Sequence, residues 1–231
     1  LQLAQVPLTP NEDQKKAIQQ ILKAQHHYQA FLLDGLTGSG KTEVYLQVMH
    51  EVLKQGKQVL VLVPEIGLTP QTVARFKSRF HCDVALLHSG LNDSKRLQAW
   101  QHAQTGKASI IIGTRSAIYT PLPQLGLIIL DEEHDLSFKQ QEGFRYHTRD
   151  VALYRGHLQN CPVILGSATP SIDSYHLVES GKLHLLELNQ RAGIAVLPKM
   201  YVVDLKVAKK KHGLSQTLIE QIKHTLERKE Q

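Results

Sequence analysis

A glycine-rich turn constrains this chain more than any other feature of its sequence. Residues 35–42 read G-L-T-G-S-G-K-T, which fits the pattern G-x-x-x-x-G-K-[ST]. An apolar run at residues 31–33 precedes the turn, and helical periodicity follows it from about residue 42 to residue 55. Glycines let the backbone curl so that its N–H groups point inward at a phosphate, and the start of the helix adds the positive end of its dipole. We therefore predict a phosphate-binding loop in which Lys41 reaches the terminal phosphates and Thr42 offers a hydroxyl to Mg²⁺.

The rest of the chain alternates short apolar runs with helical stretches. The apolar runs are continuous, which indicates strands that are buried on both faces. Repeated strand–helix–strand units of this kind predict an α/β fold with a mostly parallel sheet and helices on both faces. The predicted strands are residues 31–33, 59–63, 84–87, 109–112, 127–130 and 163–165. A capping box, T-P-N-E at residues 9–12, is expected to start a first helix with one apolar face.

An acidic run follows the predicted strand at residues 127–130. Its sequence is D-E-E-H, at residues 131–134. Ligands bind at the carboxyl ends of the strands in open α/β sheets, so these carboxylates are expected beside the phosphate loop. We predict that Asp131 holds Mg²⁺ through water and that Glu132 orients and deprotonates an attacking water. Alone the run is only suggestive, but with the phosphate loop it completes a magnesium–nucleotide site.

Two further strand ends carry small polar residues. G-T-R-S-A at residues 113–117 places Thr114 and Arg115 where a hydroxyl, a backbone N–H and a positive charge can contact a nucleic-acid phosphate. G-S-A-T-P at residues 166–170 places two hydroxyls, on Ser167 and Thr169, where they can bridge neighbouring loops. Each motif alone is more often a plain turn or helix cap. Their order along the chain favours a functional interpretation.

The segment from residue 138 to residue 147 mixes aromatic and basic side chains. Aromatic faces and cations suit stacking on unpaired bases. The alternative is that the rings fold back onto the core, but Gly143 and the polar neighbours favour an exposed loop. The predicted contacts to nucleic acid are Phe138, Lys139, Phe144, Arg145 and Tyr146.

Composition agrees with a globular protein that meets a polyanion. The formal net charge is +6 and the isoelectric point is near 9.2, which modestly favours a nucleic-acid partner. The two cysteines, Cys82 and Cys161, are far apart, which excludes a disulfide framework and a zinc site built from this chain's thiols. No apolar run is long enough to span a bilayer, so we expect no membrane association. Because the chain begins with Leu1 and not with Met, we expect a piece of a longer protein.

The order of these motifs resembles that of superfamily 2 helicases and, within them, of the bacterial replication-restart helicases. The resemblance covers nearly the whole chain and is carried by residues 38–42, 64–71, 113–117, 131–134 and 166–170. It implies a RecA-like P-loop NTPase fold that binds ATP and Mg²⁺. It also implies movement 3′ to 5′ on single-stranded DNA at forks, in the cytoplasm with the nucleoid, alongside other primosome and single-strand-binding proteins. Zinc is expected in such full-length proteins but not in this chain.

The same resemblance assigns individual residues. It places Gln14 against the adenine and implies that His134 links the acidic run to Ser167 and Thr169. It likens residues 138–147 to an aromatic-rich loop that couples DNA contact to hydrolysis. The residues expected at the phosphates are Gly38, Ser39, Gly40, Lys41 and Thr42, and those expected in catalysis are Lys41, Asp131, Glu132 and His134.

Several parts of such a helicase are missing from the sequence. No motif of a second motor lobe appears, and in particular none with an arginine finger. We therefore predict that residues 1–189 form the first lobe and that residues 190–231 are a linker and the first helix of a truncated second lobe. A lone lobe is expected to bind Mg-nucleotide and single-stranded DNA weakly and to hydrolyse ATP poorly or not at all, because an arginine finger is worth several powers of ten in turnover.

Three alternatives stay open. The chain could be another P-loop enzyme, such as a small-molecule kinase, although a kinase has no need of the loops at residues 113–117 and 166–170. It could be a non-catalytic interaction module with a structural nucleotide. It could also be a lobe of a different superfamily 2 helicase or translocase, which residues 64–71 argue against.

Overall fold

The computed structural model describes residues 7–190, 200–208 and 210–228. The chain divides into two compact units, Leu1–Ile194 and Ala195–Gln231. Most of the predicted linker, residues 191–199, lies outside the described residues. The division of the chain into a first lobe and the start of a second one therefore stays a prediction.

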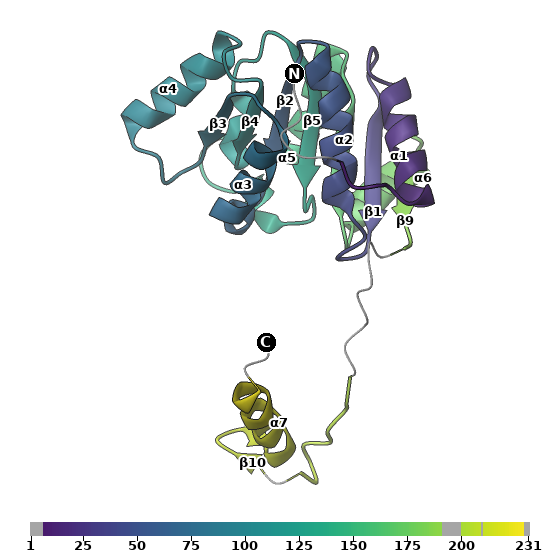
Figure 1. Cartoon of the computed structure of the whole chain (residues 1–231), viewed down its shortest axis with the longest axis vertical. Helices are drawn as coiled ribbons and strands as arrows, with labels where there is room; N and C mark the ends of the chain where they lie inside the picture. The colour runs from purple at the N-terminus through teal and green to yellow at the C-terminus, as the bar shows by residue number, and fades with distance from the viewer. Residues whose placement is uncertain (1–6, 191–199, 209, 229–231) are drawn as a thin grey trace. The chain divides into compact units, whose positions relative to one another are not determined.

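A seven-stranded sheet forms the centre of the first unit (Figure 1). Its strand order is β3-β4-β2-β5-β8-β1-β9, and every pairing is parallel. The prediction of a mostly parallel α/β sheet is confirmed. The strands are β1 (Ala30–Gly35), β2 (Gln58–Leu62), β3 (Val84–Leu87), β4 (Ile110–Gly113), β5 (Leu125–Asp131), β8 (Val163–Ser167) and β9 (His184–Leu188).

Helices cover both faces of this sheet, so the central strands bury all of their apolar side chains, and only Asp34 and Asp131 near their ends are half-buried. In β5, for example, Leu127 and Ile129 join the core under α1 and α2, while Ile128 and Leu130 join the core of the opposite face under α5. Continuous apolar strands are the sequence signature of this two-sided burial. The helices are α1 (Glu12–Lys23), α2 (Lys41–Lys54), α3 (Pro70–Arg79), α4 (Asp93–Gln104), α5 (Thr148–Gln159) and α6 (Ile172–Glu179).

The structure corrects one local prediction, the start of α1, and adds one strand, β9, that was not predicted. The N-cap of α1 is Asn11, not Thr9, and its capping box pairs Asn11 with Gln14. The strand β9 was not predicted, because as an edge strand it buries only Leu186 and Leu188 and so lacks a continuous apolar run. Three short 3₁₀ helices, η1 (Glu65–Gly67), η2 (Arg115–Tyr119) and η3 (Leu136–Phe138), follow strand ends, and a two-stranded ribbon joins β6 (Lys139–Gln140) to β7 (Tyr146–His147).

The second unit is small. The hairpin of β10 (Lys210–Lys211) and β11 (Leu214–Ser215) leads into α7 (Gln216–Glu227). Helix α7 leaves the apolar side chains of Leu218, Ile222 and Leu226 exposed, and their spacing places them along one side of the helix. No helix in the described parts of the chain combines the length and the apolarity that crossing a bilayer requires.

Candidate functional site

The phosphate loop joins β1 to α2 and has the backbone that its glycines predict. Gly38 and Gly40 have φ angles of 81° and 85°, in the left-handed region that favours glycine. Helix α2 begins at Lys41, so its first N–H groups face the loop. Lys41 is buried, and its Nζ donates to the Gly35 carbonyl at 2.7 Å. The Lys41 ammonium is therefore already held inside the loop, where a bound phosphate would replace the Gly35 carbonyl as its partner.

Gln14 fastens the first helix to this loop. Its side-chain oxygen accepts from the Asn11 N–H, and its Nε2 donates to the Ser39 carbonyl at 2.8 Å. The side chain is buried, with 4% of its surface exposed, so neither bond is lost to water. The Gln14 amide therefore does two things: its oxygen completes the capping box of α1, and its nitrogen holds the phosphate loop.

The acidic run lies at the carboxyl end of β5 and faces the same cavity. A pocket of about 560 Å³ opens beside the phosphate loop, within the size range of ligand sites. Lys41, Thr42, Asp131 and Glu132 all line it. Its remaining wall includes the apolar side chains of Leu8 and Leu46, the cation of Arg75, and Arg79 paired with Glu43 at 2.7 Å. The two segments that the sequence linked to one magnesium–nucleotide site therefore border one pocket.

Tyr45 positions Asp131 from within α2. Its hydroxyl donates to Asp131 Oδ1 at 2.9 Å, and its ring is fully buried. The space for that hydroxyl exists because residue 166 is glycine. A Cβ at Gly166 would lie 1.6 Å from the Tyr45 hydroxyl oxygen. Gly166 is thus required by side-chain packing next to the site.

Replacing Asp131 with Asn is expected to stabilise the chain while impairing the site. Burial raises the pKa of the Asp131 carboxyl, and the Tyr45 hydrogen bond and the charge of Lys41 oppose this only in part. The ionised form is therefore disfavoured by folding, and a neutral amide keeps the acceptor for Tyr45 without that cost. A gain of about 1 kcal/mol would raise the melting temperature by roughly 2–4 °C. Thermal unfolding checks this, and a lower melting temperature would contradict it.

Glu132 and His134 have a constrained arrangement. Glu132 has a φ of 52°, a left-handed conformation that is rare for residues other than glycine and that often marks functional sites. His134 Nδ1 lies 2.7 Å from the Ser167 hydroxyl and 3.7 Å from Glu132 Oε2. Ser167 Oγ in turn accepts from the Thr169 N–H at 3.0 Å. These contacts connect the acidic run to Ser167 and to the backbone of Thr169, while the coupling role of the two hydroxyls stays a prediction.

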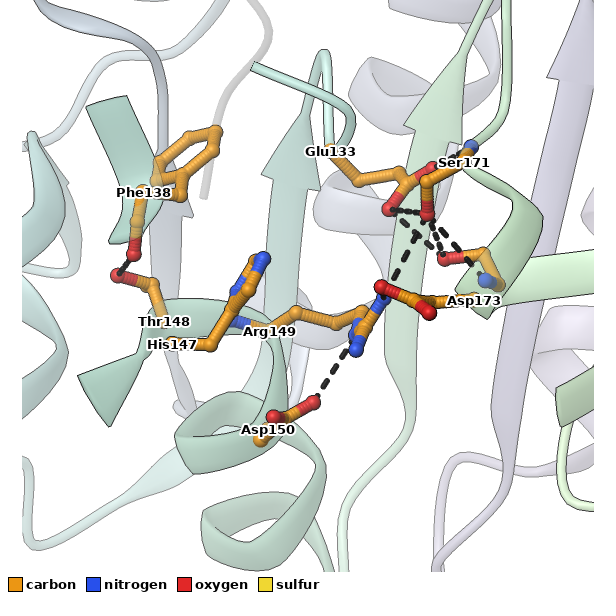
Figure 2. A network of polar contacts seen from close by, with 9 residues as sticks. Glu133, Phe138, His147, Thr148, Arg149, Asp150, Ser171 and Asp173 are labelled. Carbon is orange, nitrogen blue, oxygen red and sulfur yellow. Dashed lines mark hydrogen bonds and ion pairs between the residues drawn. The ribbon is translucent and has the colours of Figure 1, made fainter. Parts of the chain in front are cut away.

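Glu133, to which the sequence assigned no role, anchors the acidic run. Its buried carboxylate accepts from the Ser171 N–H at 2.8 Å, the Ser171 hydroxyl at 3.2 Å and the Ser174 hydroxyl at 2.8 Å. Figure 2 shows this cluster at the first turn of α6, where the helix dipole also favours an anion. Since Glu133 directly follows Glu132, these bonds fix the end of the left-handed turn.

Arg149 reaches the same cluster from the end of the aromatic segment. Its side chain is buried, with Nε donating to Asp150 at 2.9 Å and Nη1 lying 3.5 Å from the Ser171 hydroxyl and 3.7 Å from Asp173 (Figure 2). Its N–H donates to His147 Nδ1 at 3.1 Å. Burial, followed by the charge of Arg149, lowers the pKa of His147, which favours the neutral ring that accepts this bond.

Some of the groups predicted to contact nucleic acid are already hydrogen-bonded within the protein. Thr114 is buried and its N–H donates to the Leu87 carbonyl at 3.1 Å, so the expected contact from that N–H to a phosphate is wrong. Arg115 donates to the carbonyls of Ser137 and Lys139 at 3.2 and 3.0 Å, which fixes the start of the aromatic segment.

Phe138 is a clear correction. Its ring is fully buried in the core rather than exposed in a loop, because η3 turns it inward and Thr148 donates a hydrogen bond to its carbonyl. The rest of the segment matches the prediction better. Lys139, Phe144 and Arg145 are exposed, and Tyr146 is half-buried. These residues stay predicted contacts.

Comparison with known proteins agrees with this geometry. The DEAD/DEAH box helicase family matches residues 11–178. The replication restart protein PriA of Haemophilus influenzae is 52% identical over 221 residues, which are 96% of this chain and 30% of that protein. PriA of Synechocystis is 52% identical over 213 residues, covering 90% of this chain and 25% of that protein. The chain thus spans about a quarter to a third of the length of these relatives.

Structural comparison gives the same placement. The structure of RecG bound to a three-way DNA junction is similar, with a TM-score of 0.61 and 25% identity over 82% of this chain and 25% of that chain. The parallel sheet described above therefore has the RecA-like fold of a helicase lobe. The chain therefore belongs to the DEAD/DEAH box helicase family, as a homologue of the replication restart protein PriA.

Proposed function

We propose that the chain is the ATP-binding lobe of a 3′-to-5′ DNA helicase that acts in replication restart in the bacterial cytoplasm. One observation carries the proposal: Lys41, Thr42, Asp131 and Glu132 line a single pocket beside a helix N-terminus. This is the donor set that a triphosphate and a divalent cation need. The long sequence match to PriA proteins supports the restart function.

The pocket offers a place for each part of the nucleotide. The loop N–H groups and Lys41 would bind the phosphates, with the lysine exchanging its present partner, the Gly35 carbonyl, for a phosphate oxygen. The base would lie near the apolar wall of Leu8 and Leu46. Gln14 does not line the pocket, and its amide would act on the base only through the Ser39 carbonyl that it holds. Thr42 and Asp131 supply oxygen donors of the kind that Mg²⁺ prefers, and the bound cation would neutralise charge on the phosphates.

The acidic run would then organise the attacking water. Glu132 lies at the mouth of the pocket and would orient the water and accept its proton. His134 would position Glu132, because its Nδ1 lies 3.7 Å from that carboxylate and is held at 2.7 Å from the Ser167 hydroxyl. The buried bonds of Glu133 would keep this turn rigid. Such preorganisation is a large part of catalysis in phosphoryl transfer.

Single-stranded DNA is the proposed partner of the aromatic segment at residues 138–147. Lys139, Phe144, Arg145 and Tyr146 combine positive charge with ring faces, which suits backbone contact and base stacking. Forked DNA, other primosome proteins and single-strand-binding protein are proposed partners of the longer protein. Within this chain alone, turnover and unwinding should be low, since a second lobe would have to close on the nucleotide.

Nucleotide titration with and without DNA tests this function. The folded chain should bind a fluorescent ATP analogue with Mg²⁺, and unlabelled ATP and ADP should displace it better than AMP. A thymidine oligonucleotide should change the ATP affinity, whereas small-molecule phosphate acceptors should not. Absence of Mg-ATP binding by folded chain would refute the proposal. A response to a small acceptor with phosphate transfer would instead favour a kinase.

A further inference from the structure

A second hollow lies at the carboxyl ends of β3 and β4, apart from the nucleotide pocket. It has a volume of about 440 Å³, and none of the described residues lines both pockets. Two aromatic side chains, Trp100 and Tyr119, line it together with Arg96 and His88. Ser116 and Ala117 at the end of the G-T-R-S-A motif also line this hollow, but none of the described residues that line the nucleotide pocket does.

Trp100 is a large aromatic side chain that does not belong to either hydrophobic core. It lies on α4, a surface helix that packs beside the edge strand β3 and buries only Ala103 (Figure 1). Trp100 is the only tryptophan in the sequence and keeps 40% of its surface exposed. Tyr119, across the hollow at the end of η2, is 51% exposed. Large rings are rarely left open to water beside one another unless they serve as a contact surface.

These rings continue a row that begins in the aromatic segment. Phe144 is 80% exposed, and its ring centre lies 6.1 Å from that of Tyr146. Tyr146 in turn meets Tyr119 edge to face at 5.1 Å. Tyr119 then forms part of the hollow that Trp100 also lines. The row therefore runs from the segment at residues 138–147 to α4.

The charges along the row are suited to a polyanion. Arg96 donates to the carbonyls of Ser89 and Leu91 at 3.5 and 3.2 Å, so its guanidinium is held at the rim. Its one ion pair, to fully exposed Asp93 at 3.7 Å, is easily exchanged for a phosphate. Among the described residues that line the hollow, none is acidic. Rings flanked by cations bind unpaired nucleic acid by stacking and charge, whereas an apolar protein partner would not need the cations.

We infer that Trp100 and Tyr119 form a base-stacking subsite for single-stranded nucleic acid. The strand would pass from Phe144 and Tyr146 to this hollow, where a base inserts between the two rings and Arg96 contacts its phosphate. The inference rests on the proposed function, since it extends the path of the single strand on this lobe. It adds a contact outside the helicase motifs, on a helix that does not touch the nucleotide pocket.

Intrinsic fluorescence tests the subsite directly, because the single tryptophan reports only on Trp100. Titration of the whole chain with a thymidine oligonucleotide should quench this fluorescence, whereas an abasic oligonucleotide of equal length should bind by charge but leave the fluorescence nearly unchanged. In parallel, fluorescence anisotropy of a labelled oligonucleotide measures affinity. Trp100→Ala should weaken binding by about 5- to 100-fold, as expected for one lost stacking contact. Trp100→Phe should retain most of the affinity.

Matched variants separate the possible outcomes. Tyr154→Ala removes a ring that is 66% exposed on α5, away from this row, and should leave affinity unchanged. Thermal unfolding confirms that each variant is folded. If the oligonucleotide binds but neither quenches Trp100 nor responds to Trp100→Ala, the subsite is wrong while the DNA-binding function stands. If Trp100→Ala weakens abasic and normal strands equally, stacking is refuted. If no oligonucleotide binds even at low salt, the subsite and the proposed DNA partner both fail.

Discussion

Lys41→Ala should lower ATP affinity about 100-fold while leaving the chain folded. In the structure the ammonium lies inside the loop with the Gly35 carbonyl as its partner at 2.7 Å. On nucleotide binding it would exchange this neutral acceptor for phosphate oxygens. Charge-assisted bonds are worth about 1.5–3 kcal/mol each, and a loss of about 2.7 kcal/mol corresponds to the 100-fold change. The loss of one neutral-acceptor bond should change stability by only about 1 kcal/mol.

The choice of nucleotide makes this test selective. Because Lys41 is expected at the terminal phosphates, ATP and ADP should lose affinity while AMP, bound through its base and ribose, should lose little. Lys54→Ala is the matched control, since Lys54 is an exposed lysine in the last turn of the same helix and pairs only with Glu51, at 3.2 Å. Titration calorimetry measures all three nucleotides. Unchanged ATP affinity in folded Lys41→Ala would refute the proposed phosphate loop.

Local patterns were sufficient to predict the elements around the nucleotide pocket. The phosphate loop is read from consecutive residues, because strand, turn and helix start are all encoded within residues 31–55. The acidic run was predictable for the same reason, since a continuous apolar strand leads directly into it. That both lie at one edge of the sheet follows from parallel pairing alone. Family resemblance placed Gln14 against the adenine, which stays a prediction; its bond to the Ser39 carbonyl of the loop and its capping of α1 were not predicted.

Contacts between segments distant in sequence were not predictable in this way. Tyr45 looks like any apolar helix residue until β8 places Gly166 beside its hydroxyl. Phe138 was expected outside because its neighbours are polar, yet a single turn of 3₁₀ helix directs its ring into the core. Arg115 was read as a phosphate ligand because of its charge, but two backbone carbonyls compete for that charge. The partners that decide the roles of Tyr45 and Arg115 lie more than 20 positions away in the sequence. The burial of Phe138 depends instead on one short turn of 3₁₀ helix.

Removing the Glu133 carboxylate should produce the largest loss of stability in the chain. Glu133→Ala would leave the Ser171 N–H and the buried Ser174 hydroxyl without their acceptor, while the Ser171 hydroxyl could still donate to Ser174 Oγ at 3.0 Å. Loss of one partner from a buried charged network costs about 3–5 kcal/mol, which corresponds to a fall in melting temperature of roughly 6–20 °C for a chain of this size. Glu133→Gln keeps one acceptor and should cost about half as much. Thermal and urea unfolding measure both variants.

Glu133→Gln also tests whether this anchor serves the neighbouring Glu132. If the bonds to α6 maintain the left-handed turn at Glu132, the variant should slow the low residual ATP hydrolysis of this lobe, measured in a single turnover with enzyme in excess. ATP affinity should stay nearly unchanged, because no phosphate contact is altered. Glu179→Gln is the matched control, since it removes an exposed carboxylate from the far end of the same helix. A variant with normal turnover and a lowered melting temperature would show that Glu133 stabilises the fold without positioning Glu132. Wild-type stability would instead mean that the three hydrogen bonds contribute little, which would contradict the predicted loss of stability.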